Sequence, residues 1–338
     1  MNAFAPLAAV RAAEAPDRAA VRAFVHAHPG ATPFHLPEWG EAVEKGCGHR
    51  SLTLLAERGG RLVGLLPLSE VRSPLFGSAL VSTGFGVEGG VLGEGADALA
   101  EAAWVLAQSR GCASVELRGG PVPTGWARNE GVYFGFTRDL AQDDEAILKA
   151  IPRKQRAEVR RALGTGLQVE VGRDLDSHYR VYAESVRNLG TPVFPRALFA
   201  AVLEGMDADI LTVRREGKPL SSVLSLYFRG TVSPYWGGGT RDARAARANE
   251  LLYFALMRHA AARGCTRFEF GRSKAGTGAF AYKKNWGFEP RPLVYAAQGA
   301  KRETNPLSPK YRLQVALWKK LPLWAANRLG PPIARGLG

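Results

Sequence analysis

A glycine-rich segment in the second half of the chain carries the side chains best suited to chemistry. Gly276 and Gly278 precede Lys283, and a loop of this kind lets backbone approach a ligand closely. The Lys283 ammonium could stabilise an oxyanion or a phosphate of an activated donor, and a solvated surface lysine is the alternative. Arg272 and Lys274 directly follow a strand-like run, where each is a candidate contact for phosphate or carboxylate, or else an exposed loop charge.

This segment continues one copy of a sequence that occurs twice. The run Arg110–Leu117 returns as Arg263–Phe270, a shift of 153 positions, and Leu54–Arg61 is echoed by Thr212–Lys218. Only the second copy runs on into the glycine-rich segment Gly271–Gly278. The duplication predicts two similar domains that share one functional site.

Glu269 stands in the second copy where Glu116 stands in the first. An outward residue on a strand in both copies is most simply structural, although a general-base role for Glu269 stays open. Tyr282 and Trp286, on either side of the lysine, are typical of packing residues, with contact to a donor as the alternative. The catalytic candidates are Lys283, Arg272 and Glu269.

A second glycine-containing stretch precedes this segment. Tyr235 and Trp236 end a strand expected over Thr231–Tyr235, and three glycines follow them. We expect this stretch to line a cleft, because glycines at a strand end permit close approach of a ligand. Its rough counterpart in the first copy is Gly84–Gly90.

Length and cysteine content bound the class of protein. The 338 residues fit two domains of about 150 residues each. Cys47, Cys112 and Cys265 form no CxxC pair, which argues against a disulfide framework or a zinc site, so a reducing cytoplasm is the simpler setting. No apolar run approaches the roughly 18 residues that a membrane span needs.

The positive charge is concentrated in the second half. Residues 1–150 carry 13 Lys and Arg against 17 Asp and Glu, whereas residues 151–338 carry 32 against 14. A one-sided positive field raises the local concentration of anionic partners such as nucleotides, RNA or an anionic lipid surface. A charge that serves solubility alone is the alternative.

Predicted elements follow the same order in both copies, which indicates an α/β (α+β) fold of two domains, each a mixed, mainly antiparallel sheet flanked by helices. No Rossmann or Walker motif follows a strand. We expect the domains to cover residues 1–150 and 151–300, followed by a basic amphipathic tail over 301–338. The tail is a cap on its domain, or else a contact to a membrane surface.

In the first domain we expect an amphipathic helix over Met1–Val25, a hairpin of Ser51–Glu57 and Leu62–Val71, a strand and loop over Leu80–Val91, a helix over Asp97–Arg110 and a strand over Ala113–Leu117. After a basic connecting helix over Gln142–Leu163 we expect helices over Ser177–Asn188, Pro195–Gly205 and Ala248–Arg263, a hairpin over Ile210–Phe228 and strands over Thr231–Tyr235 and Arg267–Phe270.

Several of these motifs together resemble a known family. The run Phe268–Ser273 and the spaced motif G-x-x-x-Y-K-K-x-W-G-F over Gly278–Phe288 resemble the second domain of FemAB-like transferases. With Arg187–Pro195 and Pro152–Arg160, they look most like the branch associated with exosortase/PEP-CTERM gene clusters. The resemblance covers nearly the whole chain up to about Gln298. It implies a tandem pair of GNAT (N-acetyltransferase-like) domains, in agreement with the internal repeat.

The resemblance implies transfer of an activated acyl or aminoacyl group to an amine. Characterised relatives use aminoacyl-tRNA to extend peptidoglycan peptides, and others in the wider superfamily use acyl-CoA. Such a reaction needs a positioned neutral amine and stabilisation of a developing oxyanion. Lys283 matches the lysine of the family's aromatic–Lys motif, which implies the second of these roles for it.

The loop before the longest helix expected in the second copy departs from the GNAT pattern. In GNAT enzymes this position holds a Q/R-x-x-G-x-G/A loop whose amides bind the pyrophosphate of CoA at a helix N-terminus. Arg241, Arg244 and Arg247 are present here, but the glycines are not. Classical acetyl-CoA binding is thereby put in doubt, whereas phosphate binding by side chains is not, and a solvated face is the alternative. Arg156 and Arg160 of the basic connecting helix are further candidates for an anionic donor.

On the acceptor side the candidate is Trp39. Relatives hold the acceptor in the first domain and tend to place a lysine one turn after the residue that corresponds to Trp39. Here Val43 and Glu44 occupy that region and Lys45 lies one step on, a departure from the pattern for a peptidoglycan-precursor acceptor.

These observations predict a cytoplasmic acyl or aminoacyl transferase without a metal, with contact to the inner face of the membrane as an extension. Its expected acceptor is an amine of a cell-envelope or exopolysaccharide-related precursor. Aminoacyl-tRNA is the favoured donor, because the second half is basic and the CoA loop is broken. An acyl-CoA-dependent N-acyltransferase and a non-catalytic GNAT pair that binds a nucleotide or precursor are the alternatives.

Overall fold

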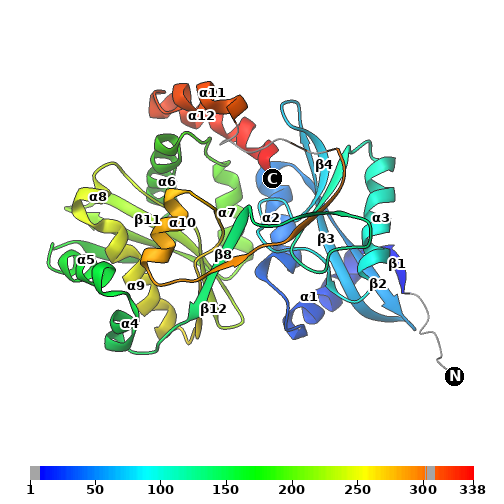
Figure 1. Ribbon diagram of the computed structural model, residues 1–338, viewed down its shortest axis with the longest axis horizontal. Coiled ribbons are helices and arrows are strands. Elements are labelled where there is room, and N and C mark those ends of the chain that lie inside the picture. The colour runs from blue at the N-terminus through cyan, green and yellow to red at the C-terminus, as the bar shows by residue number, and fades with distance from the viewer. Residues whose placement is uncertain (1–7, 301, 303–308) are drawn as a thin grey trace. The chain divides into compact units, whose positions relative to one another are not determined.

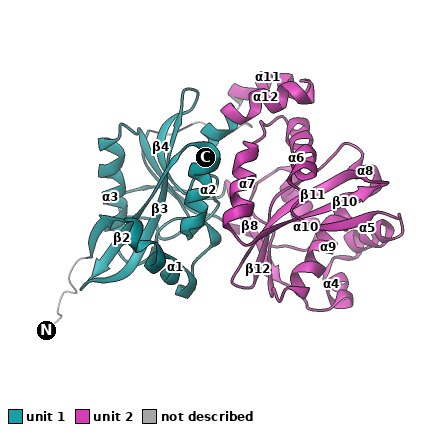
Figure 2. Ribbon diagram, turned by 180° about the vertical axis from the view of Figure 1, so that it is seen from behind, with its two compact units in different colours: residues 1–131, 293–304, 333–338 teal, residues 132–292, 305–332 magenta. Residues whose placement is uncertain are grey.

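The computed structural model describes residues 8–300, 302 and 309–338. The chain divides into two compact units, coloured separately in Figure 2. Unit 1 comprises Met1–Gly131, Leu293–Thr304 and Ile333–Gly338, and unit 2 comprises Val132–Pro292 and Asn305–Pro332. Neither unit is one continuous segment of sequence.

Unit 1 is a mixed sheet with helices packed against it (Figure 1). The strand order is β1-β2-β3-β4-β6-β16-β7, with β5 beside β3, and β4 and β6 form the parallel pair. α3 packs against β2, β3, β4 and β6, while α2 packs against β2 and β3. The elements are β1 (Ala9–Ala12), α1 (Arg18–Ala27), α2 (Pro37–Cys47), β2 (Arg50–Arg58), β3 (Arg61–Ser73), β4 (Gly77–Ser82), β5 (Leu92–Gly93), α3 (Ala96–Ser109), β6 (Ser114–Arg118), β7 (Ala127–Asn129) and β16 (Tyr295–Gly299).

Unit 2 has the strand order β9-β10-β11-β12-β13-β8-β14, with β15 beside β8. β12 and β13 form its parallel pair. The elements are β8 (Tyr133–Asp139), α4 (Asp144–Ala150), α5 (Arg153–Leu163), β9 (Gln168–Gly172), α6 (Leu175–Leu189), α7 (Arg196–Gly205), β10 (Ala208–Arg215), β11 (Lys218–Phe228), β12 (Thr231–Gly239), α8 (Ala243–Ala246), α9 (Ala248–Ala262), β13 (Arg267–Glu269), β14 (Ser273–Lys274), α10 (Gly278–Asn285), β15 (Pro290–Pro292), α11 (Arg312–Trp318) and α12 (Leu323–Ala334).

The two sheets share one plan, which confirms the α/β class and the duplication predicted from the sequence. The parallel pair occupies the same place in each strand order, and three antiparallel strands precede it in both. Both long hairpins carry a register shift near the turn, between Ala56 and Glu57 in unit 1 and between Val213 and Arg214 in unit 2. In each sheet, the strand beside the parallel pair comes from a distant part of the chain, β16 in unit 1 and β8 in unit 2.

Helices cover both faces of the second sheet. A side chain at Gly237 would meet Tyr253 of α9, and one at Gly238 would meet Ser185 of α6. Because successive strand residues point to opposite faces, α9 and α6 lie on opposite sides of β12. The aromatic part of this unit's core includes Phe136, Phe268, Trp286 and Phe288, all nearly inaccessible to solvent.

Some local predictions differ from the structure. The expected helix over Met1–Val25 is in part a strand, β1, and the helix begins at Arg18 because Glu14 and Pro16 belong to a short 3-10 turn before it; Met1–Leu7 lies outside the described residues. The expected connecting helix over Gln142–Leu163 is two helices, since the residue before Pro152 is extended.

Two further differences concern the borders of the domains. β8 belongs to the second sheet, so unit 2 starts at Val132 rather than at the predicted residue 151. The tail expected over 301–338 is divided between the units, and part of it, residues 301 and 303–308, lies outside the described residues. The glycine-rich segment ends where a helix that was not predicted, α10, begins, and Lys283 lies on that helix.

Candidate active site

The predicted site around Lys283 lies in unit 2, where two parallel strands separate. β12 and β13 pair over two residues of each strand. β13 then ends at Glu269, whereas β12 continues to Gly239. In the part of the chain that the structure describes, these strands pair no further, so the backbone of β12 after Val232 forms no ladder hydrogen bonds with β13.

A β-bulge lies in that free part of β12. Pro234 pairs with Ser225 and Trp236 pairs with Leu224, so Tyr235 is the extra residue between them. Bulges concentrate next to active sites because they redirect a strand and release backbone groups from the ladder. Tyr235 therefore lies where the ladder between β11 and β12 is interrupted. Trp236 is 5% exposed and is packed in the core instead.

Lys283, in the last turn of α10, holds the end of β13. Its Nζ donates hydrogen bonds to the carbonyl oxygens of Gly271 (3.0 Å) and Arg272 (2.9 Å). The rings of Phe136 and Phe270 lie 5.3 and 5.5 Å from Nζ. An ammonium has three N–H donors, so two are used here and one is left for a ligand.

The apolar surroundings of Lys283 change its acid–base behaviour. Burial lowers the pKa of Lys283 from its ordinary value of 10.5 to about 7. The charge of Glu269 acts in the opposite direction, and the charge of Arg272 lowers the pKa of Lys283 further. Lys283 thus changes its charge near neutral pH, and an anion bound beside it would favour the ammonium.

The other predicted residues of the segment lie beside this lysine. The guanidinium of Arg272 lies 4.8 Å over the ring of Tyr133, and Lys274 pairs with Tyr133 in the sheet. Gly276 has a φ of +75°, and Gly278 is the first residue of α10. The loop therefore brings two cations and a helix N-terminus close to the end of β13.

Tyr282 points into the core of unit 2 rather than into the loop. Its ring lies 6.0 Å from Tyr253, 6.2 Å from Trp286 and 6.3 Å from Phe270. Burial raises the pKa of Tyr282 well above its ordinary value. The side chain is therefore placed to support α10 beneath Lys283.

The predicted arginines lie around the start of α9. Arg247 precedes α9 with a φ of +56°, and its Nε donates to Glu158 of α5 at 2.7 Å. Arg244 is exposed in α8, and the backbone N–H of Arg241 donates to Glu184 at 2.8 Å. The ion pair between Arg247 and Glu158 joins this loop to α5.

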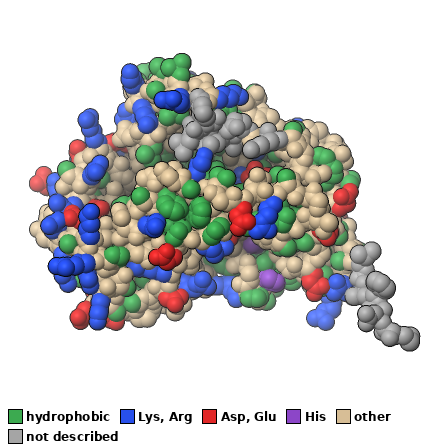
Figure 3. Space-filling model, viewed as in Figure 1, with side chains coloured by type: hydrophobic (Ala, Val, Ile, Leu, Met, Phe, Trp, Pro, Cys, Tyr) green, Lys and Arg blue, Asp and Glu red, His purple; other side chains and the backbone are tan. Residues whose placement is uncertain are grey.

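α5 extends this basic surface. Arg160 is exposed, and Arg156 donates to the carbonyl of Lys149 at 3.4 Å. Lys and Arg side chains gather over the α5 and α8 region in Figure 3. Unit 2 thus presents a cationic surface next to the N-terminus of α9, where an anionic donor would be attracted.

The first turn of α9 is already occupied by an acid. Glu250 stands in that turn, and burial raises the pKa of its carboxyl. A side chain added at Gly239 would meet Asn249 at 2.8 Å, so the turn is also closely packed against β12. Since the partial positive charge of a helix N-terminus favours one anion at short range, Glu250 competes with a pyrophosphate there.

In unit 1, Trp39 is wholly buried and holds the Gly84–Gly90 loop. Its Nε1 donates to the carbonyl of Gly84 at 3.1 Å, and its ring packs edge-on against Phe34 at 4.8 Å. A side chain at Gly90 would overlap the Gly119 carbonyl at 1.9 Å. Trp39 therefore positions this loop and does not present its own surface to a ligand.

Three residues that shape the site were not among the predicted ones. Gly271 has a φ of +66°, and its carbonyl accepts a hydrogen bond from Lys283. The repeat could have indicated this glycine, because the first copy has Arg118 at the matching position. Phe136 comes from a strand that the sequence pattern did not reveal. Glu250 could have been found as an acid in the first turn of an expected helix.

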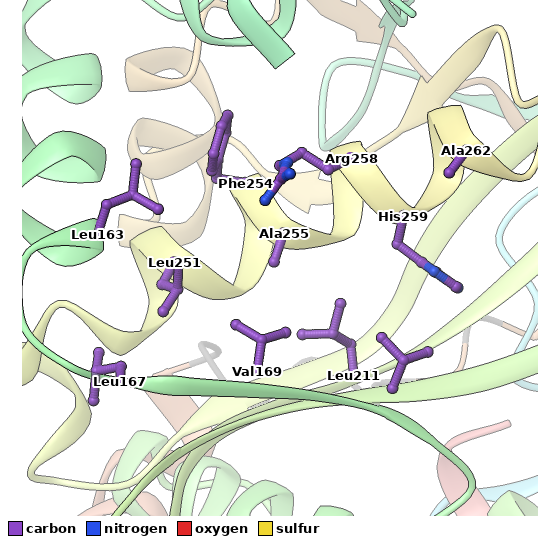
Figure 4. A pocket seen from close by; sticks show the side chains of 11 residues that line it. Leu163, Leu167, Val169, Leu211, Leu251, Phe254, Ala255, Arg258, His259 and Ala262 are labelled. Carbon is purple, nitrogen blue, oxygen red and sulfur yellow. The ribbon is translucent and has the colours of Figure 1, made fainter. Parts of the chain in front are cut away.

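Unit 2 also has an apolar groove that contains none of the predicted site residues. It has a volume of about 430 Å³ between α9, the end of α5 and the edge strand β9 (Figure 4).

Within the described residues, no group of three or more His, Cys, Asp or Glu could hold a metal ion. No described helix is long and apolar enough to cross a membrane.

Comparisons with known proteins agree with the architecture. Residues 149–284 match the family described as "Acetyltransferase (GNAT) domain". No curated protein matches the chain. The structure of FemX has a TM-score of 0.66 at 15% identity, covering 84% of this chain and 96% of FemX. A tandem GNAT protein from the clavulanic acid biosynthesis pathway has a TM-score of 0.55 at 15% identity, over 87% of this chain and all of that one. L-PGS from Bacillus licheniformis has a TM-score of 0.53 at 14% identity, over 91% and 98%.

The fold and the matched domain define an acyltransferase of the GNAT class. Residues 149–284 are a GNAT acetyltransferase domain by this match, and the chain shares its fold with FemX and with a tandem GNAT protein, consistent with the FemAB-like resemblance of its motifs.

Proposed function

We propose that this protein transfers an aminoacyl group from aminoacyl-tRNA to an amine of a cell-envelope or exopolysaccharide-related precursor. The observation that carries the proposal is Lys283, a half-buried lysine that donates to the two carbonyl oxygens just after β13 and keeps its third N–H for a ligand. The site offers a donor for an oxyanion, which suits attack on a donor substrate that is already activated.

In the proposed reaction the acceptor amine attacks the carbonyl carbon of the donor ester. The C–N bond forms, the ester C–O bond breaks, and the third N–H of Lys283 donates to the oxyanion that develops on the carbonyl oxygen. The amine loses one proton and the leaving alkoxide gains one. Glu269 is the candidate to accept the proton of the amine, since its charge is close enough to influence Lys283.

Two features of unit 2 support tRNA over CoA as the donor. Glu250 and the close packing at Gly239 crowd the first turn of α9, where the GNAT pattern predicts pyrophosphate binding. The exposed cations of α5 and α8 suit a long polyanion such as tRNA. Each contact between such a cation and a phosphate adds to the affinity, and this contribution weakens as the salt concentration rises. We propose Arg156, Arg160, Arg241 and Arg244 as contacts for that backbone.

An acyl-CoA donor is the second candidate, because the matched family is an acetyltransferase family. In that case Arg241, Arg244 and Arg247 would bind the CoA phosphates through their side chains. Both candidate donors are made in the cytoplasm, where we therefore place the reaction. The acceptor side stays a prediction for the first copy, with its glycine loop at Gly84–Gly90.

The decisive experiment offers the purified protein aminoacyl-tRNA or acetyl-CoA with a panel of amino-sugar and peptide amines, and follows acylated product by mass spectrometry. We expect product with aminoacyl-tRNA, and an apparent tRNA affinity that falls about a hundredfold or more between 50 and 200 mM salt. Product with acetyl-CoA alone would replace the donor. No product with either donor, together with binding of a nucleotide-linked precursor, would favour the non-catalytic alternative.

A further inference from the structure

The end of unit 2 formed by α11 and α12 is unusually apolar on its outside. Leu313, Leu317, Trp324 and Leu329 are 70%, 57%, 73% and 51% exposed, and Leu189 at the end of α6 is 68% exposed. We call these five residues the tail patch. A soluble surface rarely leaves so many large apolar side chains in one short stretch, so the tail patch marks a contact with something else.

α11 and α12 are held firmly enough to present this surface. Arg187 of α6 donates to the carbonyl oxygens of Lys319 and Leu321 at 3.5 and 3.4 Å. Val315 packs so closely against Gly190 that a side chain there would come within 2.6 Å of it. Because one side of α11 is fixed against the end of α6, Leu313 and Leu317, one turn apart, are left on the outside.

The charge around the tail patch is positive throughout. Residues 309–332 contain Lys310, Arg312, Lys319, Lys320 and Arg328 and no acidic residue. Within the described residues none of these five cations forms an ion pair, whereas arginines elsewhere in the unit, such as Arg214 and Arg263, do. Figure 3 shows hydrophobic and basic side chains together over α11 and α12.

We propose that the tail patch docks on an anionic lipid bilayer. Apolar side chains next to unpaired cations, with an exposed tryptophan between them, are the combination that enters the headgroup region of a membrane. A protein partner would need acidic groups facing five separate cations, whereas a bilayer surface supplies a continuous field of anions to all of them. The inference rests on the proposed function only for the choice of the inner membrane face.

The test measures binding of the full-length protein to vesicles. We expect sedimentation with phosphatidylcholine vesicles that contain about one third phosphatidylglycerol, and little with phosphatidylcholine alone. The variant K319Q/K320Q removes two charges and should lower the partition coefficient about 30-fold, because each basic residue near such a surface contributes about 1 kcal/mol. R50Q/R61Q removes two exposed cations of unit 1 and serves as the matched control, expected to bind like the original protein.

Insertion of the apolar side chains has its own readout. Brominated acyl chains should quench the fluorescence of Trp324, and the quenched fraction should fall in W324F, since Trp39, Trp236 and Trp286 are buried and Trp104, Trp126 and Trp318 are half-buried. Leu317→Asp should abolish binding, whereas Leu75→Asp, at a similarly exposed leucine of unit 1, should leave it unchanged. Circular dichroism checks that each variant is folded.

Vesicle binding does not require turnover, so its failure is separate from failure of the proposed reaction. Equal binding to neutral and anionic vesicles, or unchanged binding by K319Q/K320Q and L317D, overturns the proposal. If vesicles do not bind and sedimentation velocity instead shows a dimer that L317D dissociates, the tail patch covers a second copy of the chain.

Discussion

The two units build the same sheet but end their parallel pairs in opposite ways. In unit 1, Arg118 closes the end of β6: its guanidinium pairs with Glu116 at 2.7 Å and donates to the carbonyl oxygens of Thr83 (3.2 Å) and Gly86 (3.1 Å). In unit 2, the matching residue of the repeat is Gly271, which leaves its carbonyl to Lys283. One cation is used to fix a loop, while the other keeps a donor for a ligand.

This difference shows how a duplicated fold divides its work. The buried Arg118 is 6% exposed and has partners for its charge, so its contribution is structural. Lys283 lies among aromatic rings, and burial lowers its pKa to about 7 although the charge of Glu269 acts in the opposite direction. A lysine whose charged form is disfavoured by burial is a candidate for function rather than for stability.

The largest effect should follow from removing Lys283. Lys283→Ala takes away the proposed oxyanion donor, and kcat/KM should fall about 100- to 1000-fold, as for other single donors of this kind. The measurement is the initial rate of acyl transfer over a range of donor concentrations. Lys284→Ala is the matched control, because this neighbour on α10 is exposed. Equal rates for the two variants would remove Lys283 from the reaction.

The converse is expected for the matching residue of unit 1. Arg118→Ala removes the hydrogen bonds that this buried guanidinium gives to Glu116 and to two loop carbonyls, and the free energy of unfolding should fall by about 3 kcal/mol. Lys283→Ala should change the free energy of unfolding far less, because among the described residues Lys283 forms hydrogen bonds to two carbonyl oxygens and no ion pair with a carboxylate. Urea unfolding followed by circular dichroism measures both. A similar loss of stability in the two variants would mean that both cations are structural.

The pH dependence separates the two charge states of Lys283. If the ammonium is the active form, kcat/KM should fall tenfold for each pH unit above about 7, the pKa to which burial lowers Lys283. The useful quantity is the ratio of the rate of the original protein to that of Lys283→Arg, since titration of the acceptor amine cancels in it. That ratio should fall as the pH rises, because arginine keeps its charge. A ratio that increases with pH would make neutral Lys283 a base.

Much of this comparison could be predicted from the sequence, and the rest depended on long-range pairing. The repeat predicted two similar sheets; Lys283 was a candidate because it follows the glycine-rich loop and matches the family motif, and Arg272 because it follows a strand end. β8 was not predicted, because it pairs with a strand far away in the sequence and no local sequence pattern identifies that partner. For the same reason the part that Phe136 plays around Lys283 had to come from the structure.

The candidate site also shows where residue type alone is insufficient. Trp39 and Tyr282 have the amphipathic side chains of ligand contacts, yet Trp39 lies in the core of unit 1 and Tyr282 is half-buried against the core of unit 2. Whether a side chain is buried depends on which elements pack over it, and the spacing of residues along the sequence does not determine this packing. The arginines before α9 were predicted from their place in the chain, but the ion pair between Arg247 and Glu158 follows from the packing of α5 on α9.

The smallest expected effect tests whether the two copies remain equivalent outside the site. Gly111 and Gly264 occupy matching positions, have φ values of +65° and +79°, and would place a side chain in open space. Alanine at either position should therefore cost about 1 kcal/mol of unfolding free energy, from backbone strain alone, and should leave kcat/KM unchanged. Thermal and urea unfolding of G111A and G264A measure the cost. A much larger loss in G264A, or a loss of activity, would show that the backbone at the start of β13 also supports the placement of Lys283, and that the two copies differ before the glycine-rich segment begins.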